Sequence, residues 1–313
     1  VDMNNPIVIF KDVETVIKNP LNKNPEILKV IEEAHNRLLN VVTSIYPGQL
    51  VLSINTGIMH YKIIEKVTSI NNVSILPNEK REYGPYIAVP FGKVLEGVVV
   101  PNTVTKPLYT EKYFNSNVSN FTIEQSMFYS SLDDQISTVK SFNKPIILID
   151  DLLHKGYRMN KLDPILKENK ANVKEVIVGV LTGNGRDLMT VKQRSVDSAY
   201  FLPKLKLWID ERDSSPSIGG DSVEGEHEKT NQNIEMTSVN LILPYTVPTF
   251  ICDASLNAMF KYSMICLENT KTILQVLEKE YQNTFERKLT LKRLGEVIRH
   301  PRRPDIGRNI SYD

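Results

Sequence analysis

The sequence has few cysteines and no long hydrophobic run. Its two cysteines, Cys252 and Cys266, lie 14 residues apart. They provide no disulfide framework and no metal-ligand spacing, so we expect a reducing, cytoplasmic setting. The longest apolar runs, such as 96–101 and 241–244, are far shorter than the roughly 20 residues that cross a bilayer. We therefore expect no membrane partner and no secretory leader.

The chain also has almost no net charge. Its 38 Lys and Arg oppose 37 Asp and Glu, which leaves +1, so the total charge requires neither a nucleic acid nor an anionic membrane. Basic character is concentrated in a tail, which carries Arg287, Lys288, Lys292, Arg293, Arg299, Arg302, Arg303 and Arg308. The tail suits contact with RNA or DNA phosphates. A solvated basic face, or a contact with a further domain, is the favoured interpretation.

The composition is that of a globular protein. The 313 residues are 41% hydrophobic and 24% charged, which allows one large domain or two smaller ones. The chain begins at Val1 and not at methionine, as expected of a domain within a longer protein. A homodimer and membership of a longer chain both stay open.

Short apolar segments alternate with helical patterns. Strands are expected at 50–54, 71–76, 86–101 in two pieces, 146–149, 174–181, 198–203 and 205–210. Helices are expected at 25–46, 60–70, 122–142, 162–168, 188–193 and 253–280. This alternation predicts an α/β fold with a doubly wound, mostly parallel sheet.

Composition shifts divide the chain into four expected parts. Residues 1–46 are expected to form an N-terminal helical segment, 47–210 an α/β core, 211–239 a polar loop or linker, and 240–313 a C-terminal helical region with the basic tail.

One segment, PIILIDDLLHKGYR at 145–158, places acidic residues after a buried strand. The β-branched run at 146–149 predicts a strand of a parallel sheet, and Asp150 and Asp151 follow at its carboxyl end. Ligands of open α/β sheets bind at that end. Paired carboxylates can hold Mg²⁺ or the two hydroxyls of a ribose, since both require ionised oxygen acceptors.

The residues after the acids supply donors. If 152–156 curls over the amino end of the next helix, its backbone N–H groups and the helix dipole bind a phosphate. Gly156 permits the tight backbone, and Lys155 and Arg158 add positive charge. Carboxylates for a sugar and amides for a phosphate together describe a site for a ribose 5-phosphate group.

The run IILIDDLLHKGYR resembles the phosphoribosyl pyrophosphate signature of type I phosphoribosyltransferases. The resemblance covers roughly residues 50–203 and implies their fold. It implies that Asp150 and Asp151 bind the ribose and Mg²⁺. It also implies that Lys155, Gly156, Tyr157 and Arg158 bind the 5-phosphate. The family usually carries Ser, Thr or Ala in place of Lys155, and often Thr or Ser in place of Arg158, so this loop is bulkier and more cationic.

Further assignments follow from the resemblance. Thr56 and Gly57 match the pyrophosphate-binding turn, although only one glycine is present. The segment 101–114 matches the mobile loop, in which Lys106 or Lys112 closes over the diphosphate; we take Lys106 as the catalytic candidate. Some purine-using members place a carboxylate base at the position of His154. A histidine there is a candidate base, or equally a loop residue without a role.

Other features keep two interpretations each. Paired acids at a strand end also occur in response-regulator, phosphatase and Walker-type sites. Residues 182–187 (TGNGRD) form a second anion-binding turn or only a tight turn. Tyr200, Phe201 and Trp208 stack on a base or belong to the core.

The resemblance implies a protein that binds phosphoribosyl pyrophosphate, or a nucleoside monophosphate, with Mg²⁺. Its activity is then transfer of a phosphoribosyl group to or from a nucleobase-like acceptor. The alternative is a non-catalytic sensor or scaffold domain for a phosphoribosyl ligand within a longer multidomain protein. A third hypothesis is nucleic-acid binding through the basic tail.

Overall fold

The computed structural model describes residues 2–77, 82–115, 120–126, 129–223 and 254–301. The chain forms two compact units. The first unit consists of Val1–Thr56, Tyr113–Thr122 and Lys206–Asp313, and the second unit of Gly57–Lys112 and Ile123–Leu205. These boundaries differ from the expected core at 47–210, since the first unit draws on both ends of the chain.

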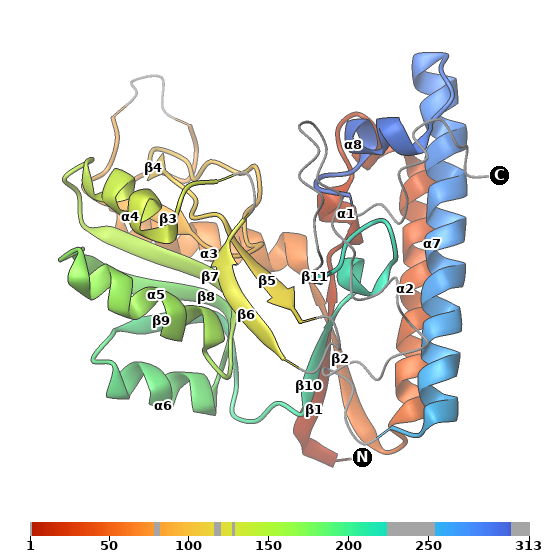
Figure 1. Cartoon of the computed structure of the whole chain (residues 1–313), viewed down its shortest axis with the longest axis horizontal. Helices are drawn as coiled ribbons and strands as arrows, with labels where there is room; N and C mark the ends of the chain where they lie inside the picture. Colours follow the sequence, from red (N-terminus) through yellow and green to blue (C-terminus); the bar gives the residue numbers. More distant parts are fainter. Residues whose placement is uncertain (1, 78–81, 116–119, 127–128, 224–253, 302–313) are drawn as a thin grey trace. The chain divides into compact units, whose positions relative to one another are not determined.

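The second unit is built on a five-stranded sheet in the order β4-β3-β7-β8-β9 (Figure 1). The strands are β3 (Ile87–Pro90), β4 (Val104–Thr105), β7 (Ile146–Leu153), β8 (Val173–Thr182) and β9 (Val196–Leu202). Every neighbouring pair is parallel. The predicted α/β fold with a mostly parallel sheet is therefore confirmed.

Helices cover both faces of this sheet. The helices are α3 (Thr56–Ile70), α4 (Leu132–Lys140), α5 (Tyr157–Glu168) and α6 (Gly183–Val191). Leu148 and Val178 of the sheet share one apolar cluster with residues of α4, α5 and α6. On α3, Met59 lies so close to Gly179 that a Cβ there would stand 2.3 Å from its sulfur. Burial on both faces explains why β7 and β8 read as continuous apolar runs.

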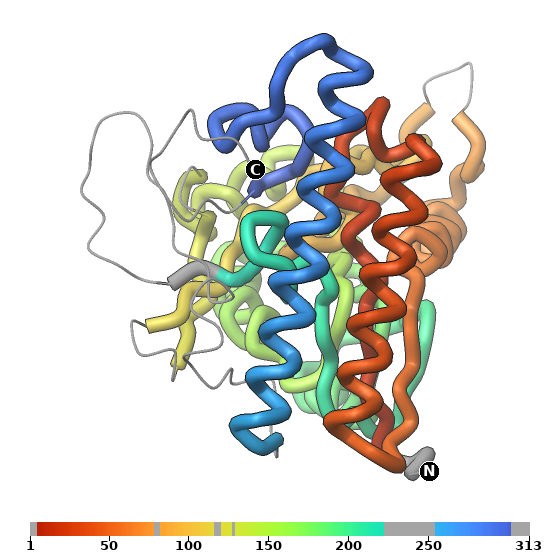
Figure 2. Tube along the Cα trace, turned by 90° about the vertical axis from the view of Figure 1, so that its right-hand side faces the viewer, coloured from red at the N-terminus to blue at the C-terminus, as the bar shows by residue number. Residues whose placement is uncertain are grey.

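The first unit contains a parallel sheet in the order β10-β1-β2, with β1 (Asp2–Lys11), β2 (Gln49–Asn55) and β10 (Leu207–Asp210). Helices α2 (Pro25–Ile45) and α7 (Leu256–Phe285) run side by side (Figure 2). Asn24 caps α2 by accepting hydrogen bonds from the N–H groups of Glu26 and Ile27. Both helices contribute apolar side chains to a cluster on this sheet.

Short elements complete the described chain. They are α1 (Val13–Val16), α8 (Leu294–Val297), 3-10 turns at Leu21–Lys23, Arg212–Ser214 and Leu291–Arg293, and strands β5 (Thr110–Phe114), β6 (Phe121–Gln125) and β11 (Ser222–Val223). These last strands form a sheet in the order β11-β5-β6. Among the described helices, none is long and apolar enough to cross a membrane.

Several local predictions were wrong. The expected helix at 122–142 is strand β6 followed by α4, which begins only where Ser131 caps it. The expected strand at 71–76 is irregular, and of the two pieces expected at 86–101 only β3 is a strand. The segment 1–46 is not wholly helical, because it begins with β1. Local propensity competes in each case with pairing partners that are distant in sequence.

The first part of the expected linker at 211–239 is buried in the first unit. Glu211, Ser214 and Ile218 are buried, and the N–H of Arg212 donates to Asp12 in a 2.8 Å hydrogen bond. The remainder, 224–239, lies outside the described residues, as do Cys252 and the end of the basic tail at 302–313.

Candidate functional site

The acidic pair lies in the second half of β7, the central strand of the second unit's sheet. The sequence predicted that the acids follow the strand, but β7 continues through them to Leu153, because Leu152 and Leu153 still pair with β8. Asp150 is 2% exposed, whereas Asp151 is partly exposed. The N–H of Asp151 donates to Asp150 Oδ1 at 2.8 Å, and the N–H of Leu152 donates to Asp151 Oδ1 at 2.7 Å. These bonds turn both carboxylates toward the same end of the strand, where the sequence predicts a ligand.

Arg158 engages both acids. Its Nε and Nη2 donate to the two oxygens of Asp150 at 3.1 and 2.6 Å, and Nη2 also lies 2.5 Å from Asp151 Oδ1. The contact with Asp150 is the bidentate geometry for which guanidinium is suited. The sequence predicts that Arg158 binds a phosphate. In the structure its guanidinium contacts the two carboxylates.

Burial sets the electrostatics of Asp150. Loss of water raises the pKa of Asp150 well above its usual value, Arg158 opposes that rise, and the neighbouring charge of Asp151 adds to it. Breaking such a pair leaves an uncompensated buried charge, so any ligand that draws Arg158 away must itself satisfy the carboxylate.

Gly92 makes room for the guanidinium, and sequence reasoning missed it. It follows β3 with φ +81, and a Cβ at Gly92 would stand 3.0 Å from Cζ of Arg158. The carboxyl ends of β3 and β7 are therefore both part of this site, since the two strands pair in parallel. A glycine directly after a buried strand is the signal that points to such close approach.

Gly156 is the last residue of the segment 150–156, which we call the acidic loop, and α5 follows it. It takes a left-handed conformation with φ 75, directly before the first helical residue, Tyr157. A Cβ here would stand 2.1 Å from Leu188 Cδ2, the end of a side chain that would have to shift, so the backbone conformation is the stronger requirement for glycine. The first N–H groups of α5 have no acceptor within the helix, and the helix dipole adds positive character at the same end. Both features are suited to a phosphate.

His154 contacts Thr182, the last residue of β8. Its Nδ1 lies 2.9 Å from Thr182 Oγ1, and Thr182 also accepts a hydrogen bond from the N–H of Gly185 at 3.1 Å. Burial and the nearby charge of Lys155 lower the pKa of His154. The imidazole is therefore biased toward its neutral form, which is the form that accepts a proton.

The remaining predicted residues are dispersed. Lys155 and Tyr157 are exposed beside Gly156. Lys106 follows β4, and its backbone N–H donates to Ala88 of β3 at 2.9 Å. The segment carrying Lys106 thus runs along the edge of the sheet beside β3, since Leu108 and Phe91 form a parallel bridge further on.

The predicted pyrophosphate turn is the start of α3. Thr56 is the first residue of this helix, and Gly57 is exposed beside it. The hydroxyl of Thr56 is buried and has no hydrogen-bond partner among the described residues. An unsatisfied buried hydroxyl at a helix amino end is costly, and an anion bound there would remove that cost.

The TGNGRD turn at 182–187 and the aromatic residues of β9 each kept two interpretations from the sequence. Thr182 caps α6, and a Cβ at Gly185 would stand 2.2 Å from the carbonyl oxygen of Leu153, so the TGNGRD turn allows close packing against the acidic loop. Phe201, at the carboxyl end of β9, is 43% exposed and carries the Arg186 guanidinium 4.9 Å above its ring. The Tyr200 ring makes the same kind of contact, with the Lys62 ammonium 4.6 Å from its centroid.

The donor set at the acidic loop fits Mg²⁺ only in part. Among the described residues no group of three or more His, Cys, Asp or Glu side chains converges to hold a metal. Mg²⁺ commonly takes one or two carboxylates together with substrate phosphates and water. Asp150 and Asp151 could supply the carboxylates once Arg158 leaves them.

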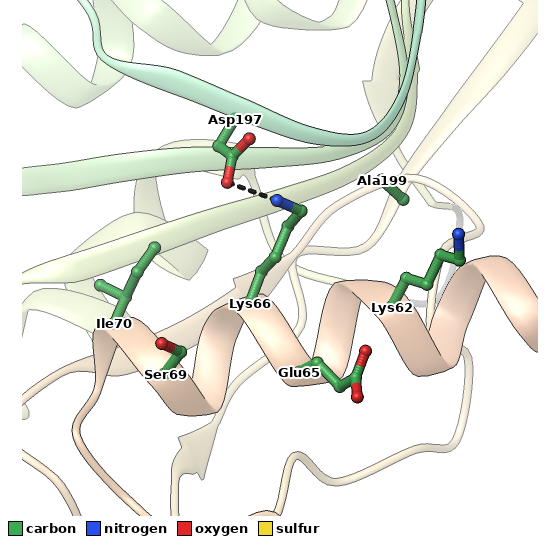
Figure 3. A pocket seen from close by; sticks show the side chains of 7 residues that line it. All are labelled: Lys62, Glu65, Lys66, Ser69, Ile70, Asp197 and Ala199. Atoms are coloured by element: carbon green, nitrogen blue, oxygen red, sulfur yellow. Dashed lines mark hydrogen bonds and ion pairs between the residues drawn. The ribbon is translucent and has the colours of Figure 1, made fainter.

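An open cavity of about 460 Å³ lies elsewhere on the second unit (Figure 3). It is lined by α3 and the first half of β9, and Lys66 pairs across it with Asp197 at 2.7 Å. It lies at the amino end of β9, whereas ligands of parallel sheets bind at the carboxyl ends. We therefore do not place the site there.

Several solved structures that are similar to this chain are phosphoribosyltransferases. An adenine phosphoribosyltransferase from Thermoanaerobacter pseudethanolicus is 14% identical over 46% of this chain and 81% of its own, with a TM-score of 0.26. A hypoxanthine phosphoribosyltransferase from Staphylococcus aureus is 14% identical over 48% and 76%, with a TM-score of 0.29. The enzyme from Trypanosoma cruzi, complexed with its product IMP, is 12% identical over 47% and 74%, with a TM-score of 0.27.

These structural neighbours are type I phosphoribosyltransferases. The sequence matches no family model, and no curated protein matches it.

Proposed function

We propose that the acidic loop binds a phosphoribosyl group. Asp150 and Asp151 accept hydrogen bonds from the ribose hydroxyls, and the first turn of α5, with Lys155 and Arg158, binds the 5-phosphate. The observation that carries this proposal is the convergence of two carboxylates on Arg158, in the second half of β7 and a few residues before the left-handed Gly156 that precedes α5. Acceptors for a diol and donors for a phosphate are thus only a few residues apart.

Arg158 is an exchangeable partner in this proposal. It now neutralises both acids. Ribose hydroxyls would replace its N–H donors on the carboxylates, and the guanidinium would turn to the phosphate, for which it is equally suited. Each group keeps hydrogen-bond partners in this exchange, and Mg²⁺ would supply the positive charge that the carboxylates lose when Arg158 turns away.

The reaction we propose for the site is phosphoribosyl transfer. In the forward direction the bond from ribose C1 to the departing diphosphate breaks, a bond from C1 to a ring nitrogen of the base forms, and the nitrogen's proton passes to His154. Mg²⁺, held by Asp150, Asp151 and the diphosphate, would supply charge neutralisation. The protein's own contribution is mainly positioning and electrostatic stabilisation.

A second candidate is a phosphoribosyl-ligand sensor without turnover. The closed contact of Arg158 with both acids favours it, because ligand binding would switch Arg158 between two partners. Incubation with phosphoribosyl pyrophosphate, Mg²⁺ and a panel of nucleobases separates the two candidates. Formation of a nucleoside monophosphate supports transfer, whereas binding without product supports the sensor.

If transfer is observed, replacement of His154 by asparagine is expected to lower its rate by about 100-fold, the lower range for loss of a general base. Affinity for phosphoribosyl pyrophosphate, measured by calorimetry, is expected to stay within about twofold, because the proposal gives His154 a role in the chemical step and none in holding the ribose or the phosphate. An unchanged rate would show that His154 is a loop residue without a catalytic role.

A further inference from the structure

A chain of hydrogen bonds in the first unit links a serine, a histidine and a glutamate. Ser53 Oγ lies 2.9 Å from Nε2 of His35, and Nδ1 of His35 lies 3.2 Å from Oε2 of Glu211. Both distances fall within the range that joins a nucleophile to its base and the base to the group that orients it. Separate ring nitrogens serve the two contacts, as in a serine hydrolase triad.

Each residue is fixed by a different element of the unit. His35 lies on α2, Ser53 on β2, and Glu211 just after β10, where its N–H donates to Phe10 of β1 at 3.2 Å. His35 and Glu211 are 4% and 2% exposed, whereas Ser53 is exposed. The base and its partner are therefore shielded from water, whereas the serine residue is at the surface.

The charged neighbours of Glu211 only partly offset the effect of its burial, so its pKa is raised overall. Burial raises the pKa of Glu211, while the hydrogen bond from His35 and the charge of Lys11 lower it, and Glu32 opposes them. Lys11 is itself bound to Glu32. With Glu211 ionised, Nδ1 of the imidazole donates to it, and Nε2 is left to accept the proton of Ser53.

Glu211 is also only partly satisfied. Its second oxygen, Oε1, is buried and has no hydrogen-bond partner among the described residues. A buried carboxylate in this state costs stability, and such groups are more frequent where they serve a function. If His35 needed only a structural partner, a neutral side chain would serve at lower cost.

The sheet places donors near Ser53. Ser53 stands opposite Ile9, and two residues further on, Asn55 stands opposite Lys11. Alternate residues of a strand share a face, so the Asn55 amide and the Lys11 ammonium lie on the face that carries Ser53. The Lys11 ammonium is paired with Glu32, so the register places an amide and an ion pair, and not a free cation, on this face.

We propose that Ser53, His35 and Glu211 form a nucleophilic site that acts on carboxylic esters. The bond from Ser53 Oγ to the acyl carbon forms, the bond from that carbon to the leaving oxygen breaks, and the hydroxyl proton passes through His35 to the departing alcohol. Water then attacks the acyl-serine, releases the acid and restores the hydroxyl. Glu211 is a positioning residue, because it acts through His35.

A fluorophosphonate probe tests the site directly, because its phosphorus bonds to an activated serine oxygen as fluoride leaves. We expect labelling of the native full chain at Ser53, located by peptide mass mapping, and complete loss of that label in Ser53→Ala. Ser44→Ala is the matched control: Ser44 is also exposed in the first unit, but its hydroxyl donates to the carbonyl of Val41 at 2.7 Å. That variant should label as the wild type does.

Glu211→Gln keeps the shape of the side chain and tests the positioning role. We expect the labelling rate to fall by more than about tenfold, because the imidazole loses the charge that fixes its protonation. A purely structural role would change the unfolding midpoint and leave the rate unchanged. Hydrolysis of 4-nitrophenyl acetate by the wild type, and not by Ser53→Ala, would add turnover.

Labelling of Ser53 no faster than that of Ser44, or no faster than in urea-unfolded protein, would overturn the proposal and leave the three residues as a structural network. The result is separable from the phosphoribosyl proposal. A variant with Asp150→Asn and Asp151→Asn is expected to label at Ser53 at the wild-type rate, because the acids belong to the other unit.

Discussion

Replacement of Asp150 and Asp151 together by asparagine is expected to weaken binding of phosphoribosyl pyrophosphate with Mg²⁺ by roughly 100-fold to 10,000-fold. Two charge-assisted hydrogen bonds to the ribose are lost, each of about 1.5–3 kcal/mol, and each 1.4 kcal/mol is about a tenfold change in affinity. Loss of the carboxylates would also remove the two ligands that we propose for Mg²⁺. Titration calorimetry of both proteins at one Mg²⁺ concentration measures the difference.

The matched control is Asp197→Asn. Asp197 belongs to the same unit, but it is exposed on β9 and pairs with Lys66 at 2.7 Å, away from the acidic loop. We expect its affinity to equal that of the wild type. Circular dichroism should confirm that the double variant is folded, because asparagine preserves the shape of each side chain. An unchanged affinity in folded double variant would contradict the assignment of the ribose to these acids.

Replacement of Gly156 by alanine is expected to destabilise the second unit by about 2–3 kcal/mol. The left-handed conformation costs a side-chain-bearing residue about 1–2 kcal/mol, and the displacement of Leu188 adds about 1 kcal/mol. Ligand binding should fall as well, because the first turn of α5 begins at this residue. Urea unfolding followed by circular dichroism gives the change in free energy.

Gly48→Ala separates strain from crowding. Gly48 also has a positive φ, +82, but a Cβ there would meet nothing within 4 Å. It should therefore show only the conformational cost of about 1–2 kcal/mol. Leu188→Ala removes the side chain that a Cβ at position 156 would meet. In a double-mutant cycle, Gly156→Ala should therefore lower the free energy of unfolding by less in the Leu188→Ala background than in the wild type. Equal effects of Gly48→Ala and Gly156→Ala, with no coupling to Leu188, would show that crowding is absent.

The sequence was informative where structure depends on neighbours along the chain. Buried strands β7 and β8 were visible as apolar runs, and the helix at 25–46 as a periodic pattern beginning near a proline. The acidic loop and the need for glycine at 156 followed from the same kind of local signal. The parallel α/β fold was predicted from the alternation of such elements.

Features that depend on distant contacts were not predicted. Nothing local indicates that β10 pairs with β1, since some 200 residues separate them, as the register of Ile7 with Leu207 shows. The ion pairs of Arg158 with Asp150 and Asp151 were not predicted, because they depend on how the segment between β7 and α5 is folded, whereas its contact with a phosphate stays a prediction. The contact of Gly92 with that guanidinium also crosses between strands.

Ser53, His35 and Glu211 are a further case of contacts that the sequence does not indicate. His35 and Ser53 are 18 residues apart, and His35 and Glu211 are 176 apart. No spacing rule links them, because triads are defined by geometry and not by sequence order. Only the packing of α2 on the β10-β1-β2 sheet brings them together.

The most direct test of the phosphoribosyl site is the thermal unfolding midpoint of the wild type with and without phosphoribosyl pyrophosphate and Mg²⁺. Selective binding to the folded state raises the midpoint, and at a ligand concentration about 100 times the dissociation constant it adds roughly 2.7 kcal/mol. We predict a rise that is absent when Asp150 and Asp151 are both asparagine. No rise in well-folded wild-type protein, also with ribose 5-phosphate and nucleoside monophosphates, would contradict the assignment.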